Sequence, residues 1–68
     1  ENSFVRLVVF DINGRHVKTL VSNYLTEGSH TVKWDAKNSF GQEMPSGIYI
    51  YQLTTNNMIS SKRMTLLR

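Results

Sequence analysis

Hydrophobic residues recur at every second position over several short runs of this chain, and this period predicts β-strands. The densest run, residues 47–55, reads Gly-Ile-Tyr-Ile-Tyr-Gln-Leu-Thr-Thr between a Pro-Ser-Gly turn and an Asn-Asn turn. Tyr49, Tyr51 and Leu53 share one face, while two isoleucines lie on the other. Because a strand that is apolar on both faces is typical of a sheet interior, we expect this strand to be central.

Two runs near the N-terminus predict a hairpin. Residues 4–10 alternate with period two and are rich in β-branched side chains. Asp-Ile-Asn-Gly follows at residues 11–14, and Asn-Gly between apolar runs indicates a tight turn because both residues accept positive φ. The second strand is expected over residues 15–21, with Val17 in the core. Its alternation breaks at residues 20–21, which leaves room for a bulge or a helical turn.

The remaining segments predict two more strands and one long loop. Residues 22–28 show no periodicity and are expected to form a connection. Residues 30–34 alternate between apolar and polar side chains, which predicts a third strand. Residues 35–47 are rich in turn formers, so they predict a polar loop, in which Phe40 either tucks back as an anchor or is an exposed contact. Residues 58–67 read as the last strand, with its end anchored.

The pattern as a whole predicts an all-β fold. No segment shows helical spacing with a cap, and five short strands with short connections favour an antiparallel β-sandwich or a fragment of one. The expected core places the apolar face of residues 47–55 against the apolar residues of the other strands. The members of that core are Tyr49, Tyr51, Leu53, Val5, Leu7, Val9, Val32 and Trp34.

Composition narrows the class further. The chain has 68 residues, so it forms one domain, and its 40% of apolar residues is enough for a core. It contains no cysteine, which excludes disulfides and thiolate zinc sites. The net charge of +3 is mild and scattered, so no nucleic-acid partner is expected, and no apolar run is long enough for a transmembrane segment. The first residues enter a strand at once, so the chain is expected to be a fragment of a longer polypeptide.

The sequence contains few residues that could act in catalysis. His16 follows the hairpin turn, and His30 alternates with apolar residues, so it is expected to be a structural histidine. No serine lies in a glycine-flanked elbow. The carboxylates lie at turns, loops and the terminus, where capping is their ordinary role. We therefore expect no enzyme activity and no cofactor.

The long loop invites a calcium hypothesis, because Asp35, Asn38 and Gly41 are residue types found in calcium loops. A calcium loop needs oxygen ligands at alternate positions and a final bidentate glutamate. Alanine, lysine and phenylalanine interrupt that pattern here. The sequence therefore favours no metal and a pair of Asx turns that close the loop.

Aromatic side chains raise the alternative of carbohydrate binding. Trp34, Phe40, Tyr49 and Tyr51 would supply stacking planes if they formed one exposed row. The same residues suit the core of a small sandwich, because aromatic side chains bury the largest area. We expect the core role.

Several features, taken in order, resemble a known bacterial family. They are Val5-Arg-Leu-Val-Val-Phe-Asp11 with Gly14-Arg15 and Val17; Gly28-Ser-His-Thr-Val-Lys-Trp-Asp35; Asn38-Ser-Phe-Gly41; Pro45-Ser-Gly47 leading to Tyr49; and Met64-Thr-Leu-Leu-Arg68. This order resembles the C-terminal sorting domain of the type IX secretion system, in the subgroup related to the immunoglobulin-like domain of the flagellar hook-capping protein. Family members begin with a Pro-Asn-Pro-rich stretch and one more strand. Both are absent here, so the resemblance implies an immunoglobulin-like sandwich that lacks its first strand.

The resemblance also implies a function. Residues 1–68 would be a single non-catalytic sorting domain, which directs a cargo protein through the periplasm and outer membrane to the cell surface or the medium. Its partners would be the type IX translocon, the sorting machinery and N-terminal cargo domains of the same chain. The residues implied in translocon recognition are Lys62, Arg63, Met64, Leu66, Leu67 and Arg68. The residues implied as the structural signature are Gly14, Trp34, Asp35, Gly41, Gly47 and Tyr49.

Two other functions remain open at this point. The first is a structural immunoglobulin-like interaction module of an extracellular assembly, which would dock or self-associate through an exposed strand edge. The second is an accessory carbohydrate-binding module, which would need an exposed row of aromatic side chains.

Overall fold

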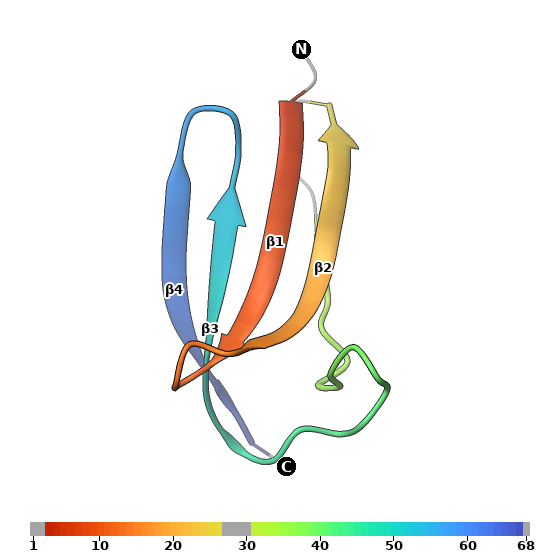
Figure 1. Ribbon diagram of the computed structural model, residues 1–68, viewed down its shortest axis with the longest axis vertical. Coiled ribbons are helices and arrows are strands. Elements are labelled where there is room, and N and C mark those ends of the chain that lie inside the picture. Colours follow the sequence, from red (N-terminus) through yellow and green to blue (C-terminus); the bar gives the residue numbers. More distant parts are fainter. Residues whose placement is uncertain (1–2, 27–30, 68) are drawn as a thin grey trace.

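The computed structural model describes residues 3–26 and 31–67, which form one antiparallel sheet (Figure 1). Its four strands have the order β2-β1-β3-β4, and β3 lies inside the sheet, so the predicted all-β class and central strand are confirmed. No helix that could cross a membrane occurs in these two stretches. The strands are β1 (Ser3–Asp11), β2 (His16–Leu25), β3 (Gly47–Thr54) and β4 (Ile59–Leu66).

The β1–β2 turn forms where it was predicted, but with a three-residue loop. The Gly14 N–H donates to the Asp11 carbonyl and the Asp11 N–H donates to the Arg15 carbonyl, both at 2.9 Å. Gly14 has a φ of 83°, whereas Asn13 is not among the residues with positive φ. Only the glycine therefore enters the left-handed region, as in a type I turn followed by a bulge.

Strand β2 is longer and less regular than its sequence pattern suggests. It continues to Leu25, through residues that were predicted to be a connection. Its pairing with β1 shifts register between Leu7 and Val8 and again between Val9 and Phe10. The first shift leaves Leu20 without a partner on β1, so of the two alternatives expected at residues 20–21, a bulge or a helical turn, a bulge forms.

The strand predicted at residues 30–34 is wrong. His30 lies outside the described residues, and residues 31–34 form no strand. The described residues therefore form a single sheet, rather than the two sheets of the predicted sandwich. The physical reason is that the neighbouring edge of β2 is engaged by a loop, because the Ser39 N–H donates to the Val17 carbonyl at 3.0 Å.

The core lies where this loop covers one face of the sheet. Val9, Val17 and Tyr49 are buried there, so the prediction of Val17 as a core residue is confirmed. The Tyr49 hydroxyl donates to the Pro45 carbonyl at 2.7 Å, a bond of the kind that characterises tyrosine corners in immunoglobulin-like sandwiches. The side chains that pack around this core are Leu20, Trp34, Met44, Tyr51, Met64 and Leu66.

Replacing Tyr49 by phenylalanine tests the tyrosine hydrogen bond. Tyr49→Phe keeps the ring in the core but leaves the Pro45 carbonyl without its donor. We expect the free energy of unfolding, measured by urea denaturation, to fall by about 1 kcal/mol. Tyr51→Phe is the matched control, because the Tyr51 hydroxyl donates no hydrogen bond within the described residues. Equal effects of the two substitutions would contradict the role of this bond.

Candidate interaction site

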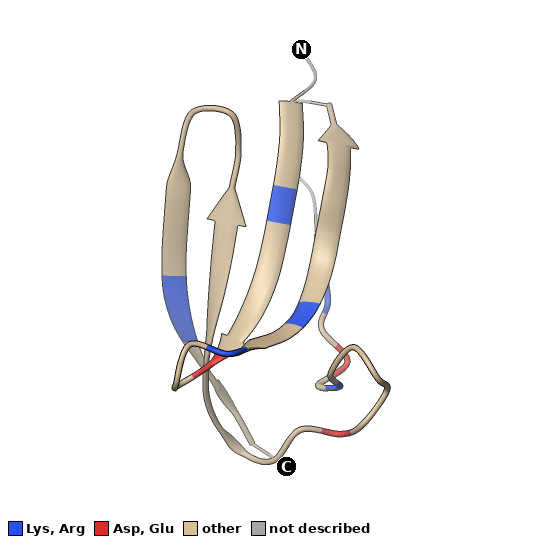
Figure 2. Ribbon diagram, in the orientation of Figure 1, with Lys and Arg blue, Asp and Glu red and all other residues tan. Residues whose placement is uncertain are grey.

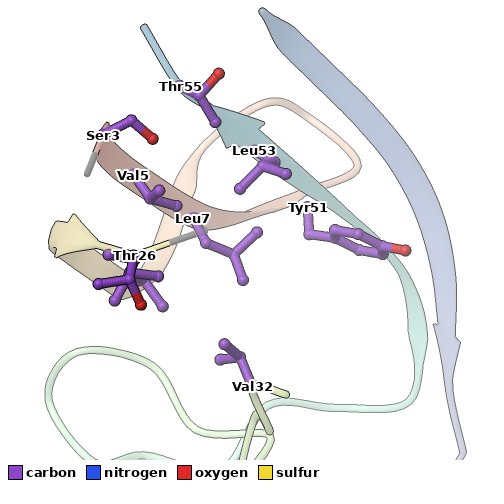
Figure 3. A pocket seen from close by; sticks show the side chains of 10 residues that line it. Ser3, Val5, Leu7, Thr26, Val32, Tyr51, Leu53 and Thr55 are labelled. Carbon is purple, nitrogen blue, oxygen red and sulfur yellow. The ribbon is translucent and has the colours of Figure 1, made fainter. Parts of the chain in front are cut away.

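An apolar groove of about 490 Å³ lies on the part of the sheet face that the loop leaves uncovered (Figure 3). In Figure 3, Leu7 and Leu53 project into it from neighbouring strands, and Val32 faces them from the opposite side. The groove is open to solvent along one side. Its lining residues are Ser3, Val5, Leu7, Val21, Leu25, Thr26, Val32, Tyr51, Leu53 and Thr55.

Strand register explains why these residues share one face. Leu7 of β1 pairs with Val21 of β2 on one side and with Leu53 of β3 on the other. Alternation then places Val5 and Tyr51 on the same face, as the sequence predicted. These side chains are only half-buried, however, and among the described residues no second sheet covers them. Val32 was expected in the core and is 41% exposed.

The described residues that line the groove carry no charge. Their polar side chains are hydroxyl-bearing, and charged residues are also absent from residues 19–26 and 47–61. Figure 2 shows the charged residues concentrated toward the end of the sheet that carries the β1–β2 turn. An occupant of the groove would find no counter-charge, so the lining selects an apolar, uncharged partner surface.

The ion pairs near the β1–β2 turn stabilise turns and loops. The Arg15 backbone N–H, with help from its guanidinium and from Asn13, lowers the pKa of Asp11 against an opposing effect of desolvation. For Asp35, desolvation raises the pKa, but the Lys37 N–H and the nearby Lys18 ammonium more than offset it, so the pKa is lowered. Lys18 Nζ lies 3.5 Å from Asp35 Oδ1. Both carboxylates are therefore structural.

The loop from residue 35 to residue 44 is closed by two Asx turns, as predicted. Asp35 Oδ1 accepts the Lys37 N–H at 3.1 Å, and Asn38 Oδ1 accepts the Phe40 N–H at 2.9 Å. Because these oxygens are bound to backbone donors, they are not arranged for calcium. In the described part of the chain, no three His, Cys, Asp or Glu side chains gather as metal ligands would.

The aromatic residues do not form an exposed row. Trp34 packs edge to face on Tyr49, with ring centroids 5.2 Å apart, and its indole N–H donates to the Lys37 carbonyl. Tyr51 is half-buried. Phe40 is 89% exposed and does not tuck back as an anchor. The arrangement removes the main support for a carbohydrate-binding module.

The C-terminal residues implied in recognition do not form one surface. Lys62 and Arg63 are exposed on opposite faces of β4, whereas Met64 and Leu66 pack against the core. Leu66 thus anchors the end of β4, whereas Leu67 beyond it is 83% exposed. Arg68 lies outside the described residues.

The six signature residues occupy structural positions. Gly14 closes the hairpin, and Gly41, with a φ of 81°, turns the long loop, in which Asp35 forms its Asx turn. Trp34 and Tyr49 pack on each other, and Gly47 begins β3. The sequence did not lead us to expect that the second half of β2 lines a groove. The feature that could have indicated it is the uncharged run Leu-Val-Ser-Asn-Tyr-Leu at residues 20–25.

Comparison with known proteins identifies the family of this chain. The FlgD Ig-like domain matches residues 1–58. The chain belongs to this family. Two curated relatives of this FlgD Ig-like domain are the basal-body rod modification protein FlgD of Salmonella typhimurium and that of Salmonella typhi. Each is 38% identical over 53 residues, which cover 78% of this chain and 23% of the relative. The chain thus spans about a quarter of the relatives' length, and no solved structure matches it.

This assignment confirms the immunoglobulin-like relationship and overturns the predicted function. The family and both relatives are FlgD rather than type IX sorting domains, so the predicted sorting signal is wrong. The predicted partners are therefore wrong as well, namely the type IX translocon, the sorting machinery and the cargo domains. The predicted secreted or cell-surface location is also wrong. Both relatives are described as basal-body rod modification proteins. The physical reason for the error is that the signature residues shape turns and core, which a fold shares across different functions.

The accessible groove predicts binding of an uncharged apolar dye. Leu53→Ser removes apolar surface from the lining, so the fluorescence of bound Nile red should fall by about twofold. Met58→Ser is the control, because Met58 is exposed outside the groove. Circular dichroism would verify that both variants remain folded. A fall that is equal for both variants would contradict dye binding in the groove.

The lowered pKa of Asp11 predicts a pH dependence of stability. Because the folded-state pKa lies below the unfolded value, the carboxylate stabilises the fold above that unfolded value, near 3.8, and this contribution is lost as pH falls through the folded pKa. Asp11→Asn removes the titration. Urea denaturation from pH 6 to pH 2 should therefore show a smaller loss of stability in Asp11→Asn than in the unsubstituted chain. Parallel pH profiles would contradict this contribution of Asp11.

Proposed function

We propose that residues 1–68 form a single non-catalytic immunoglobulin-like domain that docks protein surfaces within an assembly of the basal-body rod type. The observation that carries the proposal is the uncharged groove, which is built from three neighbouring strands of a FlgD Ig-like domain. Apolar surface left open on one face of a sheet is typical of sites that contact other proteins.

The surroundings of the groove support a role in docking rather than in chemistry. Among the described residues, the polar side chains that line it are hydroxyls of serine, threonine and tyrosine. The carboxylates with lowered pKa values, Asp11 and Asp35, do not line it. His16 lies outside it as well, with Nε2 2.9 Å from Thr19 Oγ1. The described lining therefore offers a reacting substrate no acid, base or cation.

The two relatives support an assembly of the basal-body rod type as the place where this domain acts. Both are basal-body rod modification proteins, and the matched segment makes up 23% of each. A domain of this size inside such a protein would position its neighbours through surface contacts. The partners proposed here are therefore protein subunits of the rod or of the structure built upon it.

A chimaera tests the proposal. The 53-residue segment of Salmonella typhimurium FlgD that matches this chain is replaced by the corresponding segment of this chain, and swimming is measured in soft agar. We expect swimming above that of a FlgD from which the segment is deleted. Leu53→Asp in the chimaera should abolish the gain, because it buries a charge against apolar surface.

Phe40→Asp is the matched control, because it adds the same charge at a side chain that is 89% exposed outside the groove. It should leave swimming unchanged. Immunoblots would establish that all versions accumulate equally. A chimaera that accumulates but swims no better than the deletion would overturn the proposal.

A further inference from the structure

The face of the sheet opposite the groove, termed the outer face, carries a second set of apolar side chains. Successive residues of a strand point to opposite faces, so Val8 and Phe10 lie on the other side of β1 from Leu7. The register of the sheet places Phe10 beside Ile50, and Ile50 beside Arg63. The outer face is defined by Arg6, Val8, Phe10, Ile48, Ile50 and Arg63.

The centre of the outer face is apolar and already packed. Val8 is 5% exposed, although it is not part of the core that the long loop covers. Phe10 and Ile50 near it are half-buried, and Ile48 is 39% exposed. The Phe10 ring also meets the His16 ring nearly at right angles, with ring centroids 6.4 Å apart. A partner would therefore meet a formed apolar surface, whose side chains lose little freedom on binding.

Two arginines border this apolar centre without a counter-charge. Arg6 and Arg63 are exposed, and neither has an ion-pair partner among the described residues. The carboxylates of the described chain, Asp11, Asp35 and Glu43, lie at the β1–β2 turn and in the long loop. Arginine is enriched at the energetic centres of protein interfaces, and its planar guanidinium can donate two hydrogen bonds to one carboxylate.

The long loop packs on the other face of the sheet. Its residues Trp34 and Met44 contact the core around Tyr49. Thr26 at the end of β2 lines the groove, and Val32 faces it, so the described chain leaves β2 and returns on the groove side. The outer face therefore presents its side chains away from the loop.

We propose that the outer face docks an acidic segment of a partner protein, in which carboxylates pair with Arg6 and Arg63 and apolar side chains between them cover Val8 and Ile50. The two arginines set the spacing of those carboxylates, and Figure 2 shows the basic positions of β1 and β4 on either side of β3. Their partners on β3, Thr54 and Ile50, are four residues apart, and two strand spacings separate β1 from β4, so the arginine Cα atoms lie about 16 Å apart.

The same geometry disfavours a nucleic acid as the partner. A nucleic-acid backbone carries a negative charge every few ångströms. Such a chain would leave phosphates unpaired over the apolar centre between the two arginines, where charge is costly to desolvate. A protein segment can place apolar side chains there and carboxylates only at its two ends.

This proposal extends the proposed docking function, because it gives the domain a second contact surface. The groove and the outer face lie on opposite sides of one sheet, so a single domain would contact two partner surfaces at once. The outer face does not depend on the groove, since the two faces share no side chain.

Methyl NMR of the 68-residue chain tests the proposal. The probe is an acetylated and amidated heptapeptide in which glutamate, leucine and glutamate alternate with threonine. In an extended chain its glutamates share one face about 13 Å apart, and the long side chains span the remaining distance. We expect saturable shifts of the methyl signals of Val8, Ile48 and Ile50, whereas those of Leu7 and Leu53 in the groove stay in place. Shifts confined to the groove, or none that saturate, would overturn the proposal.

Two adjacent cations of β4 supply matched variants. Arg63→Glu reverses a charge on the outer face, whereas Lys62→Glu makes the same change on the opposite face. Arg63→Glu should raise the Kd of the peptide at least about fivefold, because an attraction becomes a repulsion. Lys62→Glu should leave the Kd nearly unchanged, and circular dichroism would establish that both variants keep their sheet. Equal weakening by the two variants would show general charge attraction and would also overturn the proposal.

A charge swap tests the pairing of carboxylates with both arginines. A peptide with lysines in place of the glutamates should not bind the unsubstituted chain, but it should bind the double variant Arg6→Glu, Arg63→Glu. Failure of the double variant to bind the lysine peptide would contradict the pairing. None of these results bears on the groove, whose function is read separately by swimming of the chimaera.

Discussion

The packing of Tyr49 organises this domain. Its ring is buried with Val9 and Val17, meets Trp34 edge to face, and its hydroxyl reaches back to the Pro45 carbonyl. These contacts tie the start of β3 to the inner strand β1, to the bulged part of β2 and to the long loop. Because aromatic burial and a satisfied hydroxyl act at one residue, a small chain without disulfides gains a defined core.

The same packing leaves the other end of that face open. A sheet buries its apolar face against a second layer, and here the loop supplies that layer only over the core. Beyond it, the row formed by Val21, Leu7 and Leu53 continues across three strands and stays half-buried, with Val32 facing it. The charges lie mainly at the covered end (Figure 2), so the half-buried end combines apolar surface with a described lining that has no charge. That combination suits contact with protein rather than with an ionic ligand.

The misassigned function has a structural explanation. The residues that carried the resemblance to sorting domains, such as Gly14, Trp34 and Tyr49, act in a turn and in the core. They specify an immunoglobulin-like fold, and a fold supports many functions. Some residues that line the groove, including Leu25 and Thr26, lay in a segment that was expected to be a connection.

Local chemistry determined much of the structure from the sequence by itself. Alternation defined the strands and the shared face of Leu7, Tyr51 and Leu53, glycine placed the hairpin, and Asp35 and Asn38 set the Asx turns. Tertiary structure decided the rest. The extension of β2 to Leu25, the absence of a strand at residues 31–34 and the opening of the groove all depend on which distant backbone lies alongside. Pairing and coverage join residues far apart in the chain, so periodicity cannot specify them.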